Sequence, residues 1–598
     1  MVECLINMSR DIGFIRWKDP LAWMEEMKGT PWLRVLQKEN LHFNTAVSAL
    51  STGTVKQFED KKPEFQRGEI YTTPAESWRW KDETTVHAAA VVFCEGETVW
   101  AVEESGDGKE KYTLSCYTKK GKQWHSTISI GPYLCVKNGR CYVLETTSEL
   151  RYGACISLSA KTGKGKHLIF TEPSLEANLS LEGDDFLCSD RSGYKTLYHI
   201  ENEAIKRLEP RGVSFVTVSD GNTEPCFFAR LDDFSAPWTP FGKELTKYKL
   251  PLTVREYGID FFSIKHSLLV TSAGGVRRVY KCFSDRAPEK INEFLGTAIF
   301  DRYTANYIVK SPGSTPSVYA MNKCIIKGKN YATPTLEKAK SLDGTIVPYV
   351  LVVKPGKMLR GLMCIQYGGY GISTGLDTAR WRPYLEAGWA ITFALVRGGG
   401  DYGDCWADAA RTYRKARSIE DTECVIRSAQ KKTGISWKKT CLYGRSAGGY
   451  TLGAIVARHG EGGLIGAAYT EVPYVDLLRT TTNPRLPLTV LEYNEFGNPA
   501  KKLEDLETIL QLSPVDTLPE EGAPAIFVVA RTSLNDREVL PYESVKWITK
   551  LRGFPTPTEG AVEKYLSILD GHGHFVKGSD GIHQKNEDFI LLNGWLTS

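Results

Sequence analysis

The chain has 598 residues, of which 42% are hydrophobic and 24% are charged, and its formal net charge at pH 7 is +4. This length exceeds what one hydrophobic core supports, so the sequence predicts roughly two to four domains. The nearly balanced charge gives no sign of a nucleic-acid or membrane-surface partner, and no run of about eighteen apolar residues marks a membrane helix.

The fourteen cysteines are scattered along the chain, with no C-x-x-C pair and no spacing typical of zinc ligands. Scattered cysteines of this kind are typical of free thiols in a reducing compartment. We therefore expect a cytoplasmic protein that has no metal ion and no other cofactor. The sequence contains no signal that predicts its oligomeric state.

Residues 1–70 are predicted to form a helical segment that packs on the C-terminal domain. Apolar residues recur at helical spacing in residues 19–26 and again in residues 32–41. Such a pattern indicates a buried helix face, and packing is the simplest role for it.

Residues 71–325 consist of short β-type runs separated by turn signals at intervals of about ten residues. Asn138-Gly139 between two apolar runs predicts a hairpin. So many short strands indicate an all-β sandwich, barrel or propeller, and we favour a propeller-like domain. No clear sequence repeat sets the number of blades. The β-type runs include residues 88–94, 98–102, 167–170 and 195–200, and residues 133–144, which contain the predicted hairpin.

Residues 326–598 alternate apolar strands with segments long enough for crossover helices, such as residues 419–430. Nearly all-apolar strands that alternate with helices predict a doubly wound, mostly parallel sheet covered on both faces. A hairpin with an Asp343-Gly344 turn, in residues 337–353, precedes this pattern. The expected strands are residues 361–366, 390–396, 440–443, 466–470, 525–530 and 565–569.

The pentapeptide Gly444-Arg445-Ser446-Ala447-Gly448 fits the G-x-S-x-G nucleophile elbow, in which a strand turns sharply into a helix with a serine at the apex. The two flanking glycines are expected because a Cβ at either position would collide with the neighbouring strand or helix. Residues 450–458 suit the buried helix that should follow. Ser446 is therefore a candidate nucleophile.

A serine nucleophile needs a base and a carboxylate that orients the base, and both collect at the carboxyl ends of parallel strands. The strand at residues 525–530 runs into Asp536, and the strand at residues 565–569 runs into His572 and His574. The order Ser, Asp, His is the one that α/β-hydrolases use. Asp536 could instead cap the helix expected near residue 541.

Several motifs in the same order resemble the prolyl oligopeptidase family. They are Gln366–Gly371, Ala394–Trp406 and Gly444–Gly449. Three later motifs are similar to the oligopeptidase B branch, namely Pro473–Asp476, Asn483–Leu488 and Glu492–Pro499, and residues 19–25 resemble the family's opening motif. The middle third carries no such motif, so the resemblance there is architectural.

The resemblance implies a β-propeller that caps an α/β-hydrolase domain built from both ends of the chain. It implies that Ser446 is the nucleophile, and that the Tyr367 hydroxyl and the Ala447 backbone N–H form the oxyanion hole. Asp536 precedes Lys546-Trp547 by the spacing at which the family places its catalytic aspartate.

The resemblance leaves two candidates for the catalytic histidine. Gly573-His574-Phe575 matches oligopeptidase B, whereas Gly571-His572-Gly573 is similar to prolyl oligopeptidase itself. We favour His574, which would leave His572 as a solvated loop residue.

Two departures from the family concern substrate binding. Where the family has an arginine two residues after the catalytic aspartate, this chain has Glu538, with Arg537 one place earlier. Oligopeptidase B holds a basic side chain with carboxylates at two positions, which here are Glu492 and Asn494. Glu492 and its neighbour Glu495 could also be ordinary surface charges. A single carboxylate attracts a cation more weakly than a pair does.

The leading hypothesis from the sequence is a serine oligopeptidase that cleaves short peptides after basic residues through an acyl-enzyme. The departures favour, as an alternative, an esterase or thioesterase like the prolyl endopeptidase-like proteins. A non-catalytic scaffold, in which the propeller binds a protein partner, is the third hypothesis.

Overall fold

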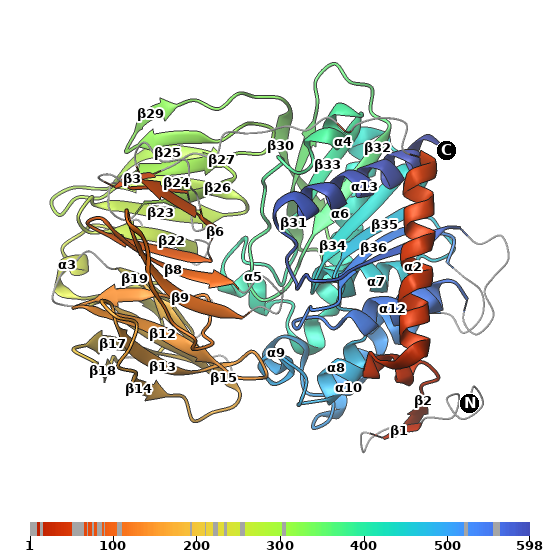
Figure 1. Ribbon diagram of the computed structural model, residues 1–598. Coiled ribbons are helices and arrows are strands. Elements are labelled where there is room, and N and C mark those ends of the chain that lie inside the picture. Colours follow the sequence, from red (N-terminus) through yellow and green to blue (C-terminus); the bar gives the residue numbers. More distant parts are fainter. Residues whose placement is uncertain are drawn as a thin grey trace.

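In the computed structural model, the chain forms two parts that lie side by side, a ring of small sheets and a large sheet flanked by helices (Figure 1). The large sheet and its helices contain both ends of the described chain. The structure describes residues 9–11, 16–50, 55, 65–67, 70–73, 77–80, 87–88, 90–104, 111–183, 185–191, 194–209, 211–218, 225–231, 236–250, 258–301, 306–518, 524–553 and 562–598.

The ring is a β-propeller in which, within the residues that the structure describes, seven small antiparallel sheets follow one another along the chain. In each sheet the neighbouring strands are consecutive in sequence. Apolar side chains from adjacent sheets share one core: Val102 and Leu114 of one sheet pack with Val143 and Ile156 of the next. Each sheet therefore needs its neighbours to bury its faces.

The propeller strands, grouped by sheet, have the following bounds. They are β3 (Phe65–Arg67), β4 (Ile70–Thr73), β5 (Ser77–Trp80) and β6 (His87–Ala88); β7 (Val91–Glu95), β8 (Thr98–Glu104), β9 (Tyr112–Thr118) and β10 (Gly121–His125); β11 (Cys135–Lys137), β12 (Arg140–Thr146), β13 (Tyr152–Ser159) and β14 (His167–Thr171); β15 (Ala177–Glu182), β16 (Phe186–Arg191), β17 (Tyr194–Glu201) and β18 (Ala204–Arg207); β19 (Ser214–Val218), β20 (Cys226–Arg230) and β21 (Thr239–Phe241), followed by the short helix α3 (Lys243–Thr246); β22 (Gly258–Ser263), β23 (Leu268–Ala273), β24 (Val276–Lys281) and β25 (Glu289–Leu295); and β26 (Thr297–Phe300), β27 (Asn306–Lys310), β28 (Ser317–Ala320) and β29 (Lys323–Ile326).

The hairpin predicted at Asn138-Gly139 is confirmed. Strands β11 and β12 pair with Lys137 opposite Arg140, and the two turn residues have φ of 51° and 72°, as a two-residue type I′ turn requires. The single strand predicted for residues 88–94 is wrong. It divides between β6, which ends at Ala88, and β7, which starts at Val91, because the chain passes from one propeller sheet to the next at this point.

The large sheet has eight strands in the order β30-β31-β33-β32-β34-β35-β36-β37, as in an α/β-hydrolase. The β30–β31 hairpin is antiparallel, as is the β31–β33 pair, and the remaining pairs are parallel. The doubly wound, mostly parallel sheet predicted from the sequence is thereby confirmed. The strands are β30 (Thr333–Lys340), β31 (Ile346–Val353), β32 (Gly361–Gln366), β33 (Trp389–Ala394), β34 (Thr440–Arg445), β35 (Ala467–Glu471), β36 (Phe527–Ser533) and β37 (Lys564–Leu569).

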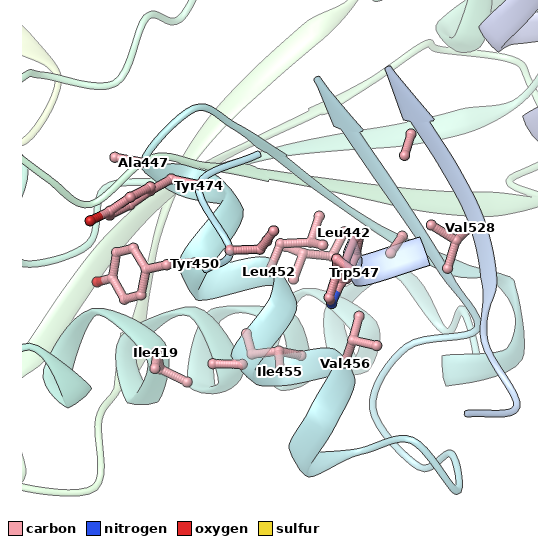
Figure 2. Packing of buried hydrophobic residues seen from close by; sticks show 14 of the residues in the cluster. Ile419, Leu442, Ala447, Tyr450, Leu452, Ile455, Val456, Tyr474, Val528 and Trp547 are labelled. Atoms are coloured by element: carbon pink, nitrogen blue, oxygen red, sulfur yellow. The ribbon is translucent and has the colours of Figure 1, made fainter. Parts of the chain in front are cut away.

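Side chains of the central strands alternate between two cores, one on each face of the sheet. Leu442 of β34 and Val528 of β36 belong to one core, whereas their neighbours Cys441 and Val529 belong to the other. In the first core, Leu442 and Val528 pack with the apolar face of α7 (Gly448–Arg458), the helix that follows Ser446, and with Trp547 (Figure 2). Both faces of the sheet therefore exclude water, which explains the nearly all-apolar strands.

The helices of this domain have the following bounds. They are α4 (Arg382–Glu386), α5 (Asp404–Asp408), η2 (Thr412–Arg414), α6 (Ala416–Thr433), η3 (Trp437–Lys439), α7 (Gly448–Arg458), α8 (Leu477–Thr482), α9 (Thr489–Phe496), α10 (Leu503–Leu512), α11 (Pro514–Thr517), α12 (Pro541–Leu551) and α13 (Gly578–Thr597). Within the described residues, no helix is long and apolar enough to cross a membrane.

The N-terminal segment contains the 3-10 helix η1 (Ala22–Glu26) and the long helix α2 (Gly29–Leu50), which lies along the outer edge of the sheet (Figure 1). The amide side chain of Asn40 pairs with the backbone of Ile568 in edge strand β37, at 2.9 Å and 2.8 Å. An exposed strand edge would otherwise offer unpaired backbone groups. The sequence missed the short antiparallel pair β1 (Ser9–Asp11) and β2 (Arg16–Lys18), because strands of three residues leave no periodic pattern.

A buried ion network fastens this segment to the hydrolase domain. Asp19 Oδ2 lies 2.6 Å from Arg479 Nε and 3.3 Å from Lys546 Nζ. Asp476 contacts both cations, at 2.7 Å and 2.8 Å, and Asp516 also pairs with Arg479. Burial alone would raise the pKa of Asp19, but the charges of Arg479 and Lys546 lower it to about 2.

Replacing Asp19 by Asn should destabilise the hydrolase domain strongly. The substitution leaves Lys546 and Arg479 buried with less negative charge, and removing one partner of a buried ion pair typically costs about 3–5 kcal/mol. Chemical denaturation followed by tryptophan fluorescence measures the loss of unfolding free energy.

Glu26→Gln is the matched control, because the Glu26–Lys28 pair is exposed, with 3.5 Å between its charged atoms, and should contribute little. Equal losses of unfolding free energy for the two variants would contradict the anchoring role of Asp19.

The stabilisation by Asp19 also depends on pH. Since the folded-state pKa of Asp19 lies below its ordinary value, its stabilising contribution is complete above about pH 4 and fades as the pH falls toward 2.

Candidate active site

Ser446 lies in the sharp turn between β34 and α7. Its φ is 51°, in the left-handed region that residues with a Cβ rarely adopt. The Ser446 amide donates to the Glu471 carbonyl and its carbonyl accepts from the Tyr474 amide, both at 3.0 Å. Neighbouring strand ends therefore hold the serine in a strained conformation at the carboxyl edge of the sheet.

Two glycines make room for this turn. A Cβ on Gly444 would lie 2.4 Å from the carbonyl oxygen of Gly448, and a Cβ on Gly449 would lie 2.6 Å from Cα of Pro473. The sequence assigned such collisions to Gly444 and Gly448, but a Cβ on Gly448 would meet nothing closer than 3.2 Å. The second strict requirement falls on Gly449, because the loop after β35 approaches the start of α7 there.

Asp536 and His574 meet at the same edge of the sheet, just beyond β36 and β37. His574 Nδ1 lies 2.8 Å from Asp536 Oδ2, and both side chains are buried. Burial alone would lower the pKa of His574, but the charge and hydrogen bond of Asp536, together with the charge of Glu538, raise it above its ordinary value. Asp536 thus occupies Nδ1 and orients the imidazole ring.

The sequence left open whether Asp536 caps the following helix and whether His572, in place of His574, is the base. Asp536 Oδ1 accepts the amides of Glu538 and Val539, each at 2.9 Å, so it orders the loop before α12 and does not cap that helix, which starts after Leu540. His572 is partly exposed and lies 3.1 Å from Asp580 Oδ2.

Tyr367 and Ala447 are the residues that the family resemblance assigns to an oxyanion hole. The Tyr367 hydroxyl lies near enough to the Ser446 side chain for the serine to favour its ionised form slightly. Burial, with the charges of Glu538 and Glu495, raises the pKa of Tyr367 to about 12, so its hydroxyl keeps its proton. Ala447 is the N-cap residue of α7, whose N-terminal amides carry partial positive charge.

Glu492 lies in α9. Tyr370 donates a hydrogen bond of 2.7 Å to Glu492 Oε1. Burial and the charges of Glu538 and Glu495 nevertheless raise the pKa of Glu492 to about 7. A positive charge near Glu492 would therefore favour its ionised form.

Glu495 has a different environment from the one its sequence position suggested. Its side chain is buried and forms ion pairs with Lys415 and, at 3.3 Å, with Arg411. Lys415 Nζ also lies 3.4 Å from the Gly368 carbonyl. Glu495 is therefore neutralised and braces the glycine turn that carries Tyr367, so its carboxylate is not available to a substrate.

Asn494 and Arg537 both lie at the boundary with the propeller. Asn494 is exposed and lines a cavity of ≈ 340 Å³, together with Lys195 and Asp190 of the propeller. Arg537 Nη2 donates to the Ser148 carbonyl of the propeller at 2.7 Å. Arg537 thus points away from the serine and connects the two domains.

Glu538 is the predicted substrate-binding residue that forms an ion pair with His574. Its Oε2 lies 3.6 Å from His574 Nε2, and its side chain is 35% exposed. Among the ion pairs of the described residues, none joins Glu538 to a lysine or an arginine. A carboxylate therefore occupies the position where the family resemblance predicts a cation.

No sequence pattern indicated the role of Arg445, the residue before Ser446. Arg445 Nη2 donates to the His574 carbonyl, and its guanidinium stacks on Phe575 with 4.2 Å between its central carbon and the ring centroid. Arg445 Nε also lies 3.7 Å from Glu471. The elbow motif leaves this position variable, so no local signal could have assigned Arg445 to holding the histidine loop.

Metal-binding and reactive-thiol chemistry find little support in the described part of the chain. No group of three or more His, Cys, Asp or Glu side chains there is placed to hold a metal ion. The thirteen cysteines of that part are free thiols, and most are buried. Burial raises the pKa of Cys188 to about 12, so this thiol stays protonated and unreactive.

The fold is that of an α/β-hydrolase capped by a propeller, and sequence comparison shows which family its second half is similar to. Residues 377–597 match the model described as the prolyl oligopeptidase family. This part of the chain carries Ser446, Asp536 and His574.

Curated relatives match mainly through the same region. Protease 2 from Moraxella lacunata is 31% identical over 251 residues, 41% of this chain and 35% of that protein. Dipeptidyl aminopeptidase BI from Pseudoxanthomonas mexicana is 32% identical over 240 residues, 39% and 32% of the two chains. Prolyl endopeptidase-like from Homo sapiens is 30% identical over 258 residues, 40% and 34%. The chain thus matches about a third of the length of these relatives.

Solved structures share the fold over nearly the whole chain. Oligopeptidase B from Leishmania major has a TM-score of 0.79 at 16% identity, covering 98% of this chain and 94% of that one. A structure from a study of two prolyl endopeptidases also has a TM-score of 0.79, at 17% identity and 99% and 98% coverage. At these identities the likeness establishes the architecture, propeller included.

Gly444→Ala should destabilise the protein, because the added Cβ would meet the Gly448 carbonyl, which cannot move without displacing α7. Overpacking of this kind costs about 1–3 kcal/mol, which a lowered thermal midpoint would report. Gly375→Ala is the control, since a Cβ there has no neighbour within 4 Å. A midpoint for Gly444→Ala as high as that of Gly375→Ala would contradict the packing argument.

Proposed function

We propose that this protein is a serine hydrolase of the prolyl oligopeptidase family that cleaves short peptides through an acyl-enzyme. The observation that carries the proposal is the buried His574–Asp536 pair, with 2.8 Å between Nδ1 and Oδ2, at the strand edge that also presents Ser446. Two of the relatives, Protease 2 and Dipeptidyl aminopeptidase BI, bear peptidase names.

In the proposed mechanism, Ser446 Oγ attacks the scissile carbonyl while His574 Nε2 takes its proton. His574 then returns the proton to the leaving group, and water hydrolyses the acyl-enzyme by the reverse sequence of proton transfers. Asp536 fixes the tautomer through its bond to Nδ1 and stabilises the imidazolium that forms.

The developing oxyanion would accept hydrogen bonds from the Tyr367 hydroxyl and the Ala447 amide. Because the pKa of Tyr367 is raised to about 12, its hydroxyl remains a donor at neutral pH. One such donor typically contributes about 3 kcal/mol to transition-state stabilisation.

A preference for short substrates follows from how the propeller covers the site. Arg537 Nη2 and the Leu488 amide donate to the carbonyls of Ser148 and Glu149 in one propeller turn, at 2.7 Å and 3.1 Å. The Gly274 amide of a second propeller turn donates to the Asp401 carbonyl at 2.7 Å. In the proposed function, these contacts hold the propeller against the hydrolase domain and so exclude folded proteins from Ser446.

The preference for basic residues rests on Glu492. Glu492 is an acidic side chain in α9 that has no lysine or arginine partner among the ion pairs of the described residues. A basic side chain that approached it would be attracted and would hold the carboxylate ionised. Asn494 is exposed in the interdomain cavity and supplies no second charge.

An esterase or thioesterase is the second candidate, and Glu538 favours it. A carboxylate in place of the expected arginine removes a donor for peptide carbonyl groups beside the scissile bond. Comparing turnover of a basic-residue peptide amide with that of the matched ester separates the two candidates. Efficient amide cleavage would exclude a pure esterase.

The proposed location is the cytosol. The spacing of the fourteen cysteines in the sequence, which suggests no disulfide framework or zinc site, supports a reducing compartment. The proposed partners are the peptide or ester substrates alone.

A fluorophosphonate probe should label the protein with one probe per chain, and Ser446→Ala should abolish labelling. The probe reacts only with a serine whose proton is removed by a neighbouring base, which here is His574. Intact-mass measurement gives the stoichiometry. Folded protein that stays unlabelled would contradict the proposed function.

Tyr367→Phe should lower kcat by about 10²-fold while KM changes little, because the hydroxyl acts on the oxyanion of the transition state. Steady-state kinetics on an ester substrate measures both constants. Tyr370→Phe is the matched control, since its hydroxyl donates to Glu492. Equal effects on kcat in the two variants would contradict the assignment of Tyr367.

A further inference from the structure

Glu538 has an unusual position for a carboxylate in a serine hydrolase. The loop after β36 carries Asp536 and Glu538, and both approach the ring of His574. Asp536 Oδ2 lies 2.8 Å from Nδ1 and Glu538 Oε2 lies 3.6 Å from Nε2. The histidine ring therefore has a carboxylate on each of its two nitrogens.

We propose that Glu538 makes the catalytic histidine responsive to cationic substrates. In the substrate-free enzyme Glu538 pairs with protonated His574, and a positively charged group of the substrate binds Glu538 and frees Nε2 to act as the base. This inference rests on the proposed hydrolase function and adds to it a means of selecting charged substrates.

Glu538 stabilises the imidazolium form of His574, which cannot act as a base. His574 must be neutral at Nε2 to accept the Ser446 proton. A carboxylate next to that nitrogen favours the charged form of the ring. The raised pKa of His574, to which Glu538 contributes with Asp536, agrees with this geometry.

The Glu538 side chain is accessible to a ligand. It is 35% exposed, in contrast to Asp536, which is fully buried. Its negative charge also raises the pKa of Glu492. An ammonium or guanidinium group bound at Glu538 would pair with its carboxylate and compete with His574 for it. Neither Glu538 nor Glu492 has a lysine or arginine partner among the ion pairs of the described residues.

The proton balance of the exchange is simple. When the cationic group binds Glu538, the imidazolium loses its second carboxylate partner and releases one proton to solvent. Near its pKa of about 7, Glu492 also releases any proton it carries. Neutral His574 then accepts the Ser446 proton, and no oxidant or further reactant is required.

The other charged groups around the histidine do not respond to substrate in this way. Asp536 is buried on the far side of the ring. Arg445, which holds the His574 carbonyl, lowers the pKa of His574 and is engaged with Glu471. His572 and Asp580 pair with each other on the loop and α13. Tyr367 keeps its proton at neutral pH.

The test compares pH profiles for three substrates with the same chromogenic leaving group. One has arginine before the scissile bond and a blocked N-terminus. The second replaces arginine by citrulline, its neutral isostere. The third has citrulline and a free N-terminal amine. The ascending limb of kcat reports the histidine in the substrate complex, and that of kcat/KM reports it in the free enzyme.

In the wild type, the ascending limb of the kcat profile should lie about one pH unit lower for a cationic substrate than for the blocked citrulline substrate. This shift corresponds to a tenfold change in the proton affinity of His574. A shift with arginine alone identifies a side-chain cation as the ligand, and a shift with the free amine alone identifies the N-terminus. In Glu538→Gln, the ascending limb of the kcat/KM profile should move to lower pH by a similar amount. The ascending limbs of the kcat profiles should then be the same for all three substrates.

Glu337→Gln is the control for removing a carboxylate, because Glu337 lies in β30 at the opposite edge of the sheet, paired with Lys432. It should leave every limb unchanged. The pH profile of labelling by a neutral fluorophosphonate measures the free-enzyme limb of each variant without turnover and shows that Glu538→Gln is folded.

Two results would overturn the proposal: equal kcat limbs for charged and neutral substrates in the wild type, or limbs in Glu538→Gln that match the wild type. Both are distinct from failure of the proposed function, in which the wild type itself would show neither labelling nor turnover.

Discussion

The strained turn at Ser446 is the constraint on which the rest of the structure depends. A serine at φ 51° persists only where its surroundings over-determine it. Gly444 allows β34 and α7 to approach closely, and the backbones of Glu471 and Tyr474 hold the turn from the next strand. The two apolar cores clamp β34 and α7, and α2 protects the sheet's outer edge through Asn40. These contacts together hold Ser446 in its strained turn.

The sequence predicted what local pattern and chain order encode. The hydrolase strands, the elbow, and the carboxylate and histidine that follow two strand ends could be read because each lies beside a periodic segment. Contacts between distant residues could not be read. The ion pair of Glu495 with Lys415, the bond from Arg537 to Ser148, and the contact of Gly449 with Pro473 join segments that meet only after folding. Glu495 and Arg537 therefore have roles that their sequence positions did not suggest.

The charges around the histidine set what the site can bind. Asp536 is buried and fixed, whereas Glu538 is partly exposed and raises the pKa of Glu492. Two carboxylates that lack lysine or arginine partners in the described structure would repel anionic substrates and attract cations. In the proposed mechanism, Asp536 and Glu538 favour the charged form of His574, so substrate charge and catalytic readiness are coupled. The departure from the family resemblance at Glu538 therefore bears on the proposed selectivity, whereas Ser446, Asp536 and His574 match the residues that the resemblance implies.

The most direct test of this account is to trap the covalent intermediate. A rapid acid quench of the protein with an ester substrate, followed by peptide mass spectrometry, locates the acyl group. The account predicts one acyl group on Ser446 in the wild type and none in Ser446→Ala. An acyl group on another residue, or turnover without any acylated serine, would contradict it.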